Sequence, residues 1–306
     1  MLNQSGRTEY EARTILASLV SLDLLTSLDG LIWLQSGKQV GIKFQQHQTT
    51  VSRNQKKCSQ IFGLELKKHH GIWAIEGRNE LLEMERKVHQ FARFSGKAPL
   101  RIEVNSWNNG FLDSLNLEAW LTGACKPPGV NRCQYLLLAN IVDAWLCPLD
   151  DTPSEIYGLK ILPLCRVPLH LMVPTNHPLL SRSRITLDET KLYPWKQIPK
   201  GAYPKTEEQL RALGLWPTKH RNHKFEEALG DQNKLNFMVQ LGTILLHEES
   251  STNLVPLPIE LGANTGVSLI FRQEYAKHKA IEDLITSLRK RLKNHQTHHP
   301  EIQLLD

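Results

Sequence analysis

HQTTVSRNQKKCSQIFG, residues 47–63, is the stretch that decides how this chain is interpreted. It has an amide- and hydroxyl-rich start, no acidic residue and a closing glycine, and it predicts a helix from about Gln48 to Phe62. Val51, Cys58, Ile61 and Phe62 are expected to face a core. Glutamine and arginine can contact base edges, while serine, threonine and lysine reach phosphate oxygens. The predicted DNA contacts are Gln48, Thr49, Thr50, Ser52, Arg53, Lys56 and Lys57.

The neighbouring residues predict the rest of a small DNA-binding domain. Apolar spacing over residues 15–36 indicates one or two amphipathic helices, which we expect to be broken by Gly37. A short second helix is expected over 38–46, and a hairpin over 64–73 with its tip near His69, His70 and Gly71. Three helices followed by a hairpin predict a winged helix-turn-helix whose third helix enters the major groove.

Basic charge is concentrated in the same part of the chain. Residues 38–101 contain 13 lysines and arginines against 5 glutamates and no aspartate, a balance of +8. The remaining residues carry 24 basic and 26 acidic side chains, a balance of −2. A basic segment on a nearly neutral body is typical of a nucleic-acid-binding domain, although a solvated basic face without a partner is the alternative.

Residues 47–63 resemble the recognition segment of LysR-type transcriptional regulators, which has the form SQPTVSRQIKALEEELG and matches without a gap. Gln48, Thr50, Val51, Ser52, Arg53, Lys56 and Gly63 fall on the family's positions. The chain departs from the family at His47, at Lys67 and at the Val40–Gly41 pair. The resemblance extends over about residues 22–293, and it implies a regulator that binds operator DNA, with RNA polymerase as a possible further partner.

A helical pattern over residues 75–94 follows the predicted hairpin. Its apolar face is formed by Leu81, Leu82, Met84, Val88, Phe91 and Phe94. A long helix leaving a small domain needs either a second copy of itself or the next domain to bury such a face. The resemblance implies a linker helix that makes a homodimer or homotetramer; packing on the chain's own C-terminal domain is the alternative.

The C-terminal two thirds alternate strands and helices, which predicts an α/β fold with largely parallel sheets. Strands are expected at 100–104, 141–146, 159–164 and 168–174, and helices at 206–213, 233–241 and 274–292. No clear second strand is visible in TGACKPPGVNRC, residues 122–133. The resemblance implies an effector-binding domain of two lobes, like type 2 periplasmic binding proteins.

The expected domains follow from these patterns. A winged helix-turn-helix covers residues 1–75, a linker helix and hinge 76–98, and the effector-binding domain 99–306. Its first lobe would comprise 99–157 and 261–306, and its second lobe 158–260. By position, a small-molecule effector between the lobes would be bound by Asn105, Ser106, Ile198, Pro199 and Lys200.

Other classes of protein find less support. Nucleotide-binding, metalloprotease and nucleophile-elbow motifs are missing, so no catalytic residue and no enzymatic activity are expected. The five cysteines, at 58, 125, 133, 147 and 165, show no paired metal-ligand spacing, so neither a metal nor a cofactor is predicted. No apolar run reaches about 18 residues, and the start of the chain does not resemble a signal peptide, so a cytoplasmic location without membrane contact is expected. Two alternatives remain: a ligand-binding or protein-interaction module with degenerate DNA contacts, and a cysteine-based redox regulator.

Overall fold

The first described helix, α2 (Leu22–Leu34), begins at Ser21, whose hydroxyl accepts the Leu24 N–H at 3.4 Å. It ends at Gln35, which adopts the left-handed conformation with φ of 60°. Helix α3 (Gly37–Lys43) then starts at once, with Ser36 as its N-cap. The predicted break at Gly37 is therefore wrong: Gln35 ends α2, and Gly37 is the first residue of α3.

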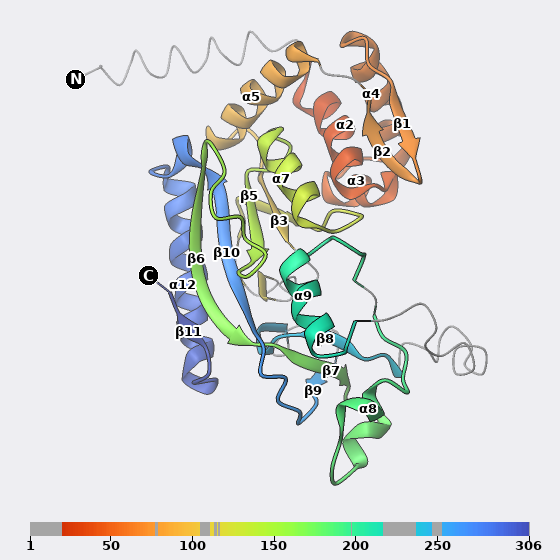
Figure 1. The fold of residues 1–306 in the computed structure, drawn as a ribbon. Helices are drawn as coiled ribbons and strands as arrows, with labels where there is room; N and C mark the ends of the chain where they lie inside the picture. The colour runs from red at the N-terminus through yellow and green to blue at the C-terminus, as the bar shows by residue number, and fades with distance from the viewer. Residues whose placement is uncertain are drawn as a thin grey trace. The chain divides into compact units, whose positions relative to one another are not determined.

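The computed structural model describes residues 20–76, 79–104, 111–112, 115, 117–196, 198–216, 237–246 and 253–305. The chain divides into two compact units. The first unit comprises residues 1–104, 117–145 and 271–282, and the second comprises 105–116, 146–270 and 283–306. Figure 1 shows the elements of each. No helix in the described ranges is long and apolar enough to cross a membrane.

A close turn joins α3 to α4 (Gln48–Ile61). The Gly41 carbonyl accepts the Gln46 N–H at 2.8 Å, and a Cβ at Gly41 would lie 2.5 Å from the Gln46 carbonyl oxygen. On α4, Val51 and Cys58 are buried, as predicted, and Phe62 is buried just beyond it. Ile61 is 43% exposed, contrary to expectation. Ile61 follows Cys58 by three residues, so its side chain is rotated by about 60° around the helix axis from the line of buried side chains.

A two-stranded hairpin completes this domain. Strands β1 (Leu66–His69) and β2 (Ile72–Ile75) pair antiparallel, with His69 opposite Ile72. His70 and Gly71 at the tip have φ of 50° and 83°, the left-handed pair that suits a two-residue hairpin turn. The predicted winged helix-turn-helix is therefore present (Figure 1).

The rest of the first unit begins with α5 (Glu80–Phe94), which Asn79 caps by accepting the Leu82 N–H at 2.8 Å. It starts five residues later than expected, because Ile75 belongs to β2 and Asn79 is the N-cap. Strand β3 (Leu100–Val104) pairs parallel with β4 (Trp120–Gly123), and α7 (Val130–Leu138) follows. The stretch 122–133 contributes only its first two residues to a strand, because β4 is four residues long and ends at Gly123; its position is fixed by pairing with β3. Strand β5 (Ala144–Pro148) starts three residues later than expected.

The second unit contains a three-stranded antiparallel sheet. Strand β7 (His170–Pro174) lies between β8 (Gln240–Gly242) and β9 (Leu254–Pro256). Leu171 and Leu241, which are paired in this sheet, belong to a buried cluster of leucines and valines drawn from residues 169–261. Since Gln240–Gly242 is a strand, the helix expected over 233–241 is wrong at its end; residues 233–236 lie outside the described part.

The remaining elements confirm the predicted α/β fold. Strand β6 (Leu159–Pro168) pairs antiparallel with β11 (Gln303–Leu304), and β10 (Asn264–Arg272) is the neighbour of β6 on its other side. The β3–β4 pair is parallel, whereas β1–β2, β6–β11, β7–β8 and β7–β9 are antiparallel. The other elements are η1 (Pro178–Ser181), α8 (Leu187–Thr190), α9 (Pro204–Ala212), η3 (Ile244–Leu246), η4 (Gln273–Tyr275) and α12 (Lys279–His298).

Candidate nucleic-acid interface

Helix α4 presents a continuous polar surface to solvent. Val51 and Cys58 are packed against α2 and α3, so the opposite side of the helix is left free. Thr50 is half-buried, at the border between the two sides. The other predicted contacts lie on the outward side and are all exposed: Gln48, Thr49, Ser52, Arg53, Lys56 and Lys57. The structure therefore brings the predicted DNA-contacting residues together on one helix.

His47 fixes the start of this helix. Its Nδ1 accepts the Thr49 N–H at 3.4 Å and lies 2.8 Å from Thr49 Oγ1. A histidine thus takes the N-cap role that a serine or threonine hydroxyl usually fills. The hydroxyl of Thr49 is already engaged by this ring, whereas Gln48 and Ser52 extend from the exposed surface.

The basic residues of α4 and Lys67 of the hairpin differ in whether acidic side chains neutralise them. Within the described residues Arg53, Lys56 and Lys57 make no ion pair, and α4 contains no acidic residue. On the hairpin, by contrast, Lys67 Nζ lies 2.8 Å from Glu65 Oε2 and 2.9 Å from Glu76 Oε2. These hydrogen bonds raise the pKa of Lys67 above its usual range. The three basic side chains of α4 and Lys68 of the hairpin, whose Nζ lies over the Trp73 ring, are thus the ones without an ion pair in this part of the described chain.

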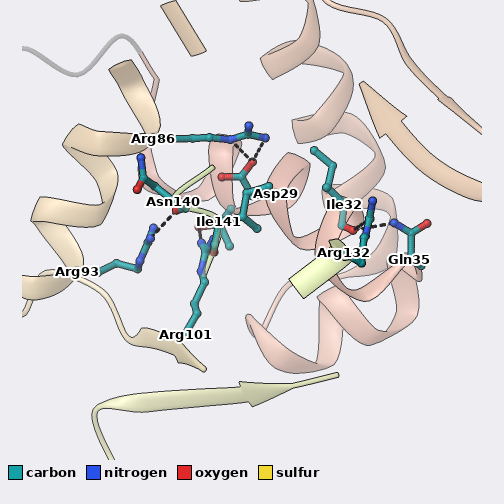
Figure 2. A network of polar contacts seen from close by, with 10 residues as sticks. Asp29, Ile32, Gln35, Arg86, Arg93, Arg101, Arg132, Asn140 and Ile141 are labelled. Carbon is teal, nitrogen blue, oxygen red and sulfur yellow. Dashed lines mark hydrogen bonds and ion pairs between the residues drawn. The ribbon is translucent and has the colours of Figure 1, made fainter. Parts of the chain in front are cut away.

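A buried polar network holds α5 inside the first unit. Arg86 donates twice to Asp29 of α2, at 2.8 and 2.6 Å, and Arg93 donates to the Asn140 carbonyl at 2.8 Å (Figure 2). Arg93 also donates to Asp143, at 2.8 Å. Gln90 also donates to Asp143, at 3.0 Å. One feature of the sequence points to this network: Arg86, His89, Gln90 and Arg93 recur at helical spacing, although the apolar face is the one that we expect to be buried.

The apolar face of α5 remains largely uncovered within the chain. Leu81 is 48% exposed and Met84 is 63% exposed, while Val88 and Phe91 are half-buried. These four residues, separated by three or four positions, form a stripe along one side of the helix. We call them the α5 stripe. Leu82 and Phe94, which the sequence placed on the same face, are buried.

Helix α2 contacts the sheet of the first unit through Trp33. This fully buried indole donates its N–H to Glu103 Oε2 on β3 at 2.5 Å. Burial raises the pKa of Glu103 to about 7. Arg101 of the same strand donates to Thr26 of α2 at 2.9 Å. The winged helix-turn-helix and β3 are thus joined by hydrogen bonds inside the first unit.

The predicted effector residues are only partly described. Asn105 and Ser106 lie outside the described residues. Ile198 is half-buried, and Pro199 and Lys200 are exposed in the loop before α9, where the Gly201 N–H bonds to Glu207 at 2.8 Å. A cavity of about 670 Å³ lies elsewhere, in the first unit, lined mainly by residues 74–75, 79–87 and 132–140. The effector site therefore stays a prediction.

The fold and the exposed helix define a winged helix-turn-helix protein. Similar solved structures include a full-length OxyR variant from Pseudomonas aeruginosa, with 16% identity over 88% of this chain and 97% of that one and a TM-score of 0.43. A full-length BenM mutant has 15% identity, 94% and 99% coverage and a TM-score of 0.42. CbnR, a LysR family transcriptional regulator, has 11% identity, 89% and 99% coverage and a TM-score of 0.44. No family model and no curated protein matches the chain.

Proposed function

We propose that this protein is a sequence-specific, DNA-binding transcriptional regulator of the LysR type. The observation that carries the proposal is the exposed surface of α4. It combines amide and hydroxyl groups with Arg53, Lys56 and Lys57, none of which is neutralised by an acidic side chain within the described residues. A helix of this kind in a winged helix-turn-helix is suited to the major groove, where arginine and glutamine contact base edges.

The remaining parts of the proposal follow from that role. The regulator would act in the cytoplasm as a homodimer or homotetramer, with the α5 stripe as the surface available to a second copy. Two DNA-binding domains would then contact two half-sites of operator DNA. A small molecule bound by residues 105–106 and 198–200 would control the assembly, and RNA polymerase would be the partner at the promoter. The protein would have no enzymatic activity.

Selection from a pool of random-sequence DNA duplexes tests the central claim. We expect the full-length protein to retain a subset that shares a short motif, repeated in inverted orientation when the protein is dimeric. Arg53→Ala and Lys56→Ala should each weaken binding to the selected duplex by roughly 5- to 150-fold, the effect of losing one contact of about 1–3 kcal/mol.

Lys160→Ala is the matched control, because Lys160 is an exposed lysine on β6 in the second unit. It removes the same charge without touching α4, so the affinity should not change. Retention of no particular sequence by the wild-type protein would reject the proposal and favour a ligand-binding or protein-interaction module. Equal losses of affinity in Arg53→Ala and Lys160→Ala would show that the protein binds the duplex only by nonspecific attraction between charges.

A further inference from the structure

Two cysteines and a glutamate meet in the interior of the first unit, and none of them lies on α4. Glu103 lies on β3, Cys125 follows β4, and Cys133 lies on α7. Their exposed fractions are 1%, 3% and 1%. Among the residues that the structure describes, this is the group in which three potential metal-ligand side chains converge. None of them takes part in the proposed DNA contact.

The distances within this cluster are those of a tetrahedral metal site. The two Sγ atoms are 3.6 Å apart, Cys133 Sγ lies 3.7 Å from Glu103 Oε1, and all three ligand atoms lie within 4.8 Å of one another. Zinc bound tetrahedrally by thiolate and carboxylate places two sulfurs about 3.8 Å apart and a sulfur and an oxygen about 3.6 Å apart. The side chains need little movement to enclose such an ion.

The carboxylate of Glu103 is held in an orientation that suits this role. Trp33 Nε1 donates to Oε2 at 2.5 Å, so Oε1 is the oxygen nearest the Cys133 thiol. The Cys125 N–H donates to both oxygens, at 2.9 and 3.1 Å. Hydrogen bonds to the outer atom of a ligating carboxylate are the usual second layer of a metal site, because they fix the direction of the inner atom.

We propose that Glu103, Cys125 and Cys133 bind a thiophilic divalent cation of the zinc class. Both thiols lose their protons when the ion binds, and a water molecule takes the fourth position. A disulfide between Cys125 and Cys133 is the alternative to metal binding. It would require the sulfurs to approach to about 2.05 Å and would not involve Glu103. Because the carboxylate lies among the thiols, the metal is favoured.

Titration of the reduced, chelator-treated full-length protein with cadmium tests the site. Cadmium–thiolate bonds absorb in the ultraviolet, and we expect this absorption to saturate at one ion per chain. Cys125→Ser and Cys133→Ser should abolish it. Glu103→Gln should weaken binding, and Trp33→Phe should weaken it by roughly 10- to 100-fold, the usual effect of losing a second-layer partner. Zinc should compete for the same site.

Cys147→Ser is the matched control, because Cys147 is also fully buried but lies outside the cluster. It should keep the cadmium absorption unchanged. A rise of the wild-type unfolding temperature with zinc concentration gives a second measurement that does not depend on whether the serine variants fold. The proposal is overturned if the reduced wild-type protein shows neither absorption nor thermal shift, or if Cys125→Ser binds cadmium as the wild type does. Since no DNA is involved, this result is independent of the proposed function.

Discussion

Arg93 and Asp143 form a two-pronged ion pair in the interior of the first unit. Arg93 Nε donates to Asp143 Oδ2 and its second guanidinium nitrogen to Oδ1, both at 2.8 Å. The side chains are only 2% and 0% exposed. Asp143 also accepts the Arg101 N–H at 2.9 Å. One carboxylate therefore connects α5 to β3.

Asp143→Ala should strongly destabilise the protein. The change leaves the Arg93 guanidinium buried without a counter-charge, which costs about 3–5 kcal/mol in free energy of unfolding. Asp188→Ala is the control, because the Asp188 side chain is 89% exposed and its pair with Lys191 should contribute less than about 1 kcal/mol. Urea denaturation of both variants measures the difference; equal losses would show that the buried pair has no special role.

His89 should make the stability of the first unit depend on pH. Burial lowers the pKa of His89, against the opposing influence of Glu85, whose Oε1 lies 3.2 Å from Nε2. The unfolded state then binds a proton more readily than the folded state. The free energy of unfolding should therefore fall as the pH drops below about 6.5, the ordinary pKa of histidine. Urea denaturation as a function of pH checks this.

The comparison for His89 is a pair of glutamine variants. His89→Gln should have a flatter dependence on pH in this range, since the neutral amide does not titrate. His70→Gln changes an exposed histidine at the hairpin tip and should keep the slope of the wild type. A slope that is unaltered in His89→Gln would assign the pH effect to other groups.

Gly41→Ala should weaken the helix-turn-helix. The added Cβ would lie 2.5 Å from the Gln46 carbonyl oxygen, which is backbone and cannot move without shifting the start of α4. We expect a loss of about 1–3 kcal/mol in stability. Gly37→Ala is a suitable control, because its Cβ would make only ordinary contacts, the nearest at 3.5 Å with Gln48. Thermal unfolding followed by circular dichroism separates the two, and the prediction fails if their melting temperatures agree.

The α5 stripe should mediate self-association. Replacing Met84 with glutamate places a charge on a side chain that is 63% exposed in the single chain. The fold of one chain should tolerate it, while a dimer that buries the stripe should dissociate more readily. Sedimentation velocity over a range of concentrations measures this. Leu192→Glu, at another exposed apolar side chain, should leave the assembly unchanged. If the wild-type protein stays monomeric at all concentrations, the α5 stripe is not an interface between two copies.

The local patterns of the sequence were sufficient for the winged helix-turn-helix. The α4 segment has capping, charge and apolar spacing that all indicate one structure, and its boundaries were predicted to within a residue. The hairpin was equally visible because its turn needs His70 and Gly71 in left-handed conformations. Such features depend on neighbours in sequence, so a single sequence carries them.

Tertiary contacts explain what the sequence did not reveal. Strand β4 is short, and it is defined by pairing with β3 rather than by its own pattern. The buried face of α5 is chosen by Asp29 and Asp143, which lie far away in sequence. The Glu103–Cys125–Cys133 cluster is likewise assembled from separate elements, and its seven-residue gap between cysteines matches no metal motif. Residues that meet only in three dimensions leave no periodic signal.

The ion pairs of the hairpin have a consequence for the thermodynamics of DNA binding. Lys67 already holds Glu65 and Glu76 as its counter-charges, so a phosphate that approached it would have to compete with them. Lys67 would therefore displace few of the counterions that are condensed on the DNA duplex. Counterions would be released by Arg53, Lys56 and Lys57 of α4, which corresponds to a logarithmic salt slope of about −2.7 for each proposed DNA-binding domain. Two such domains on one operator would give about −5.4 from α4.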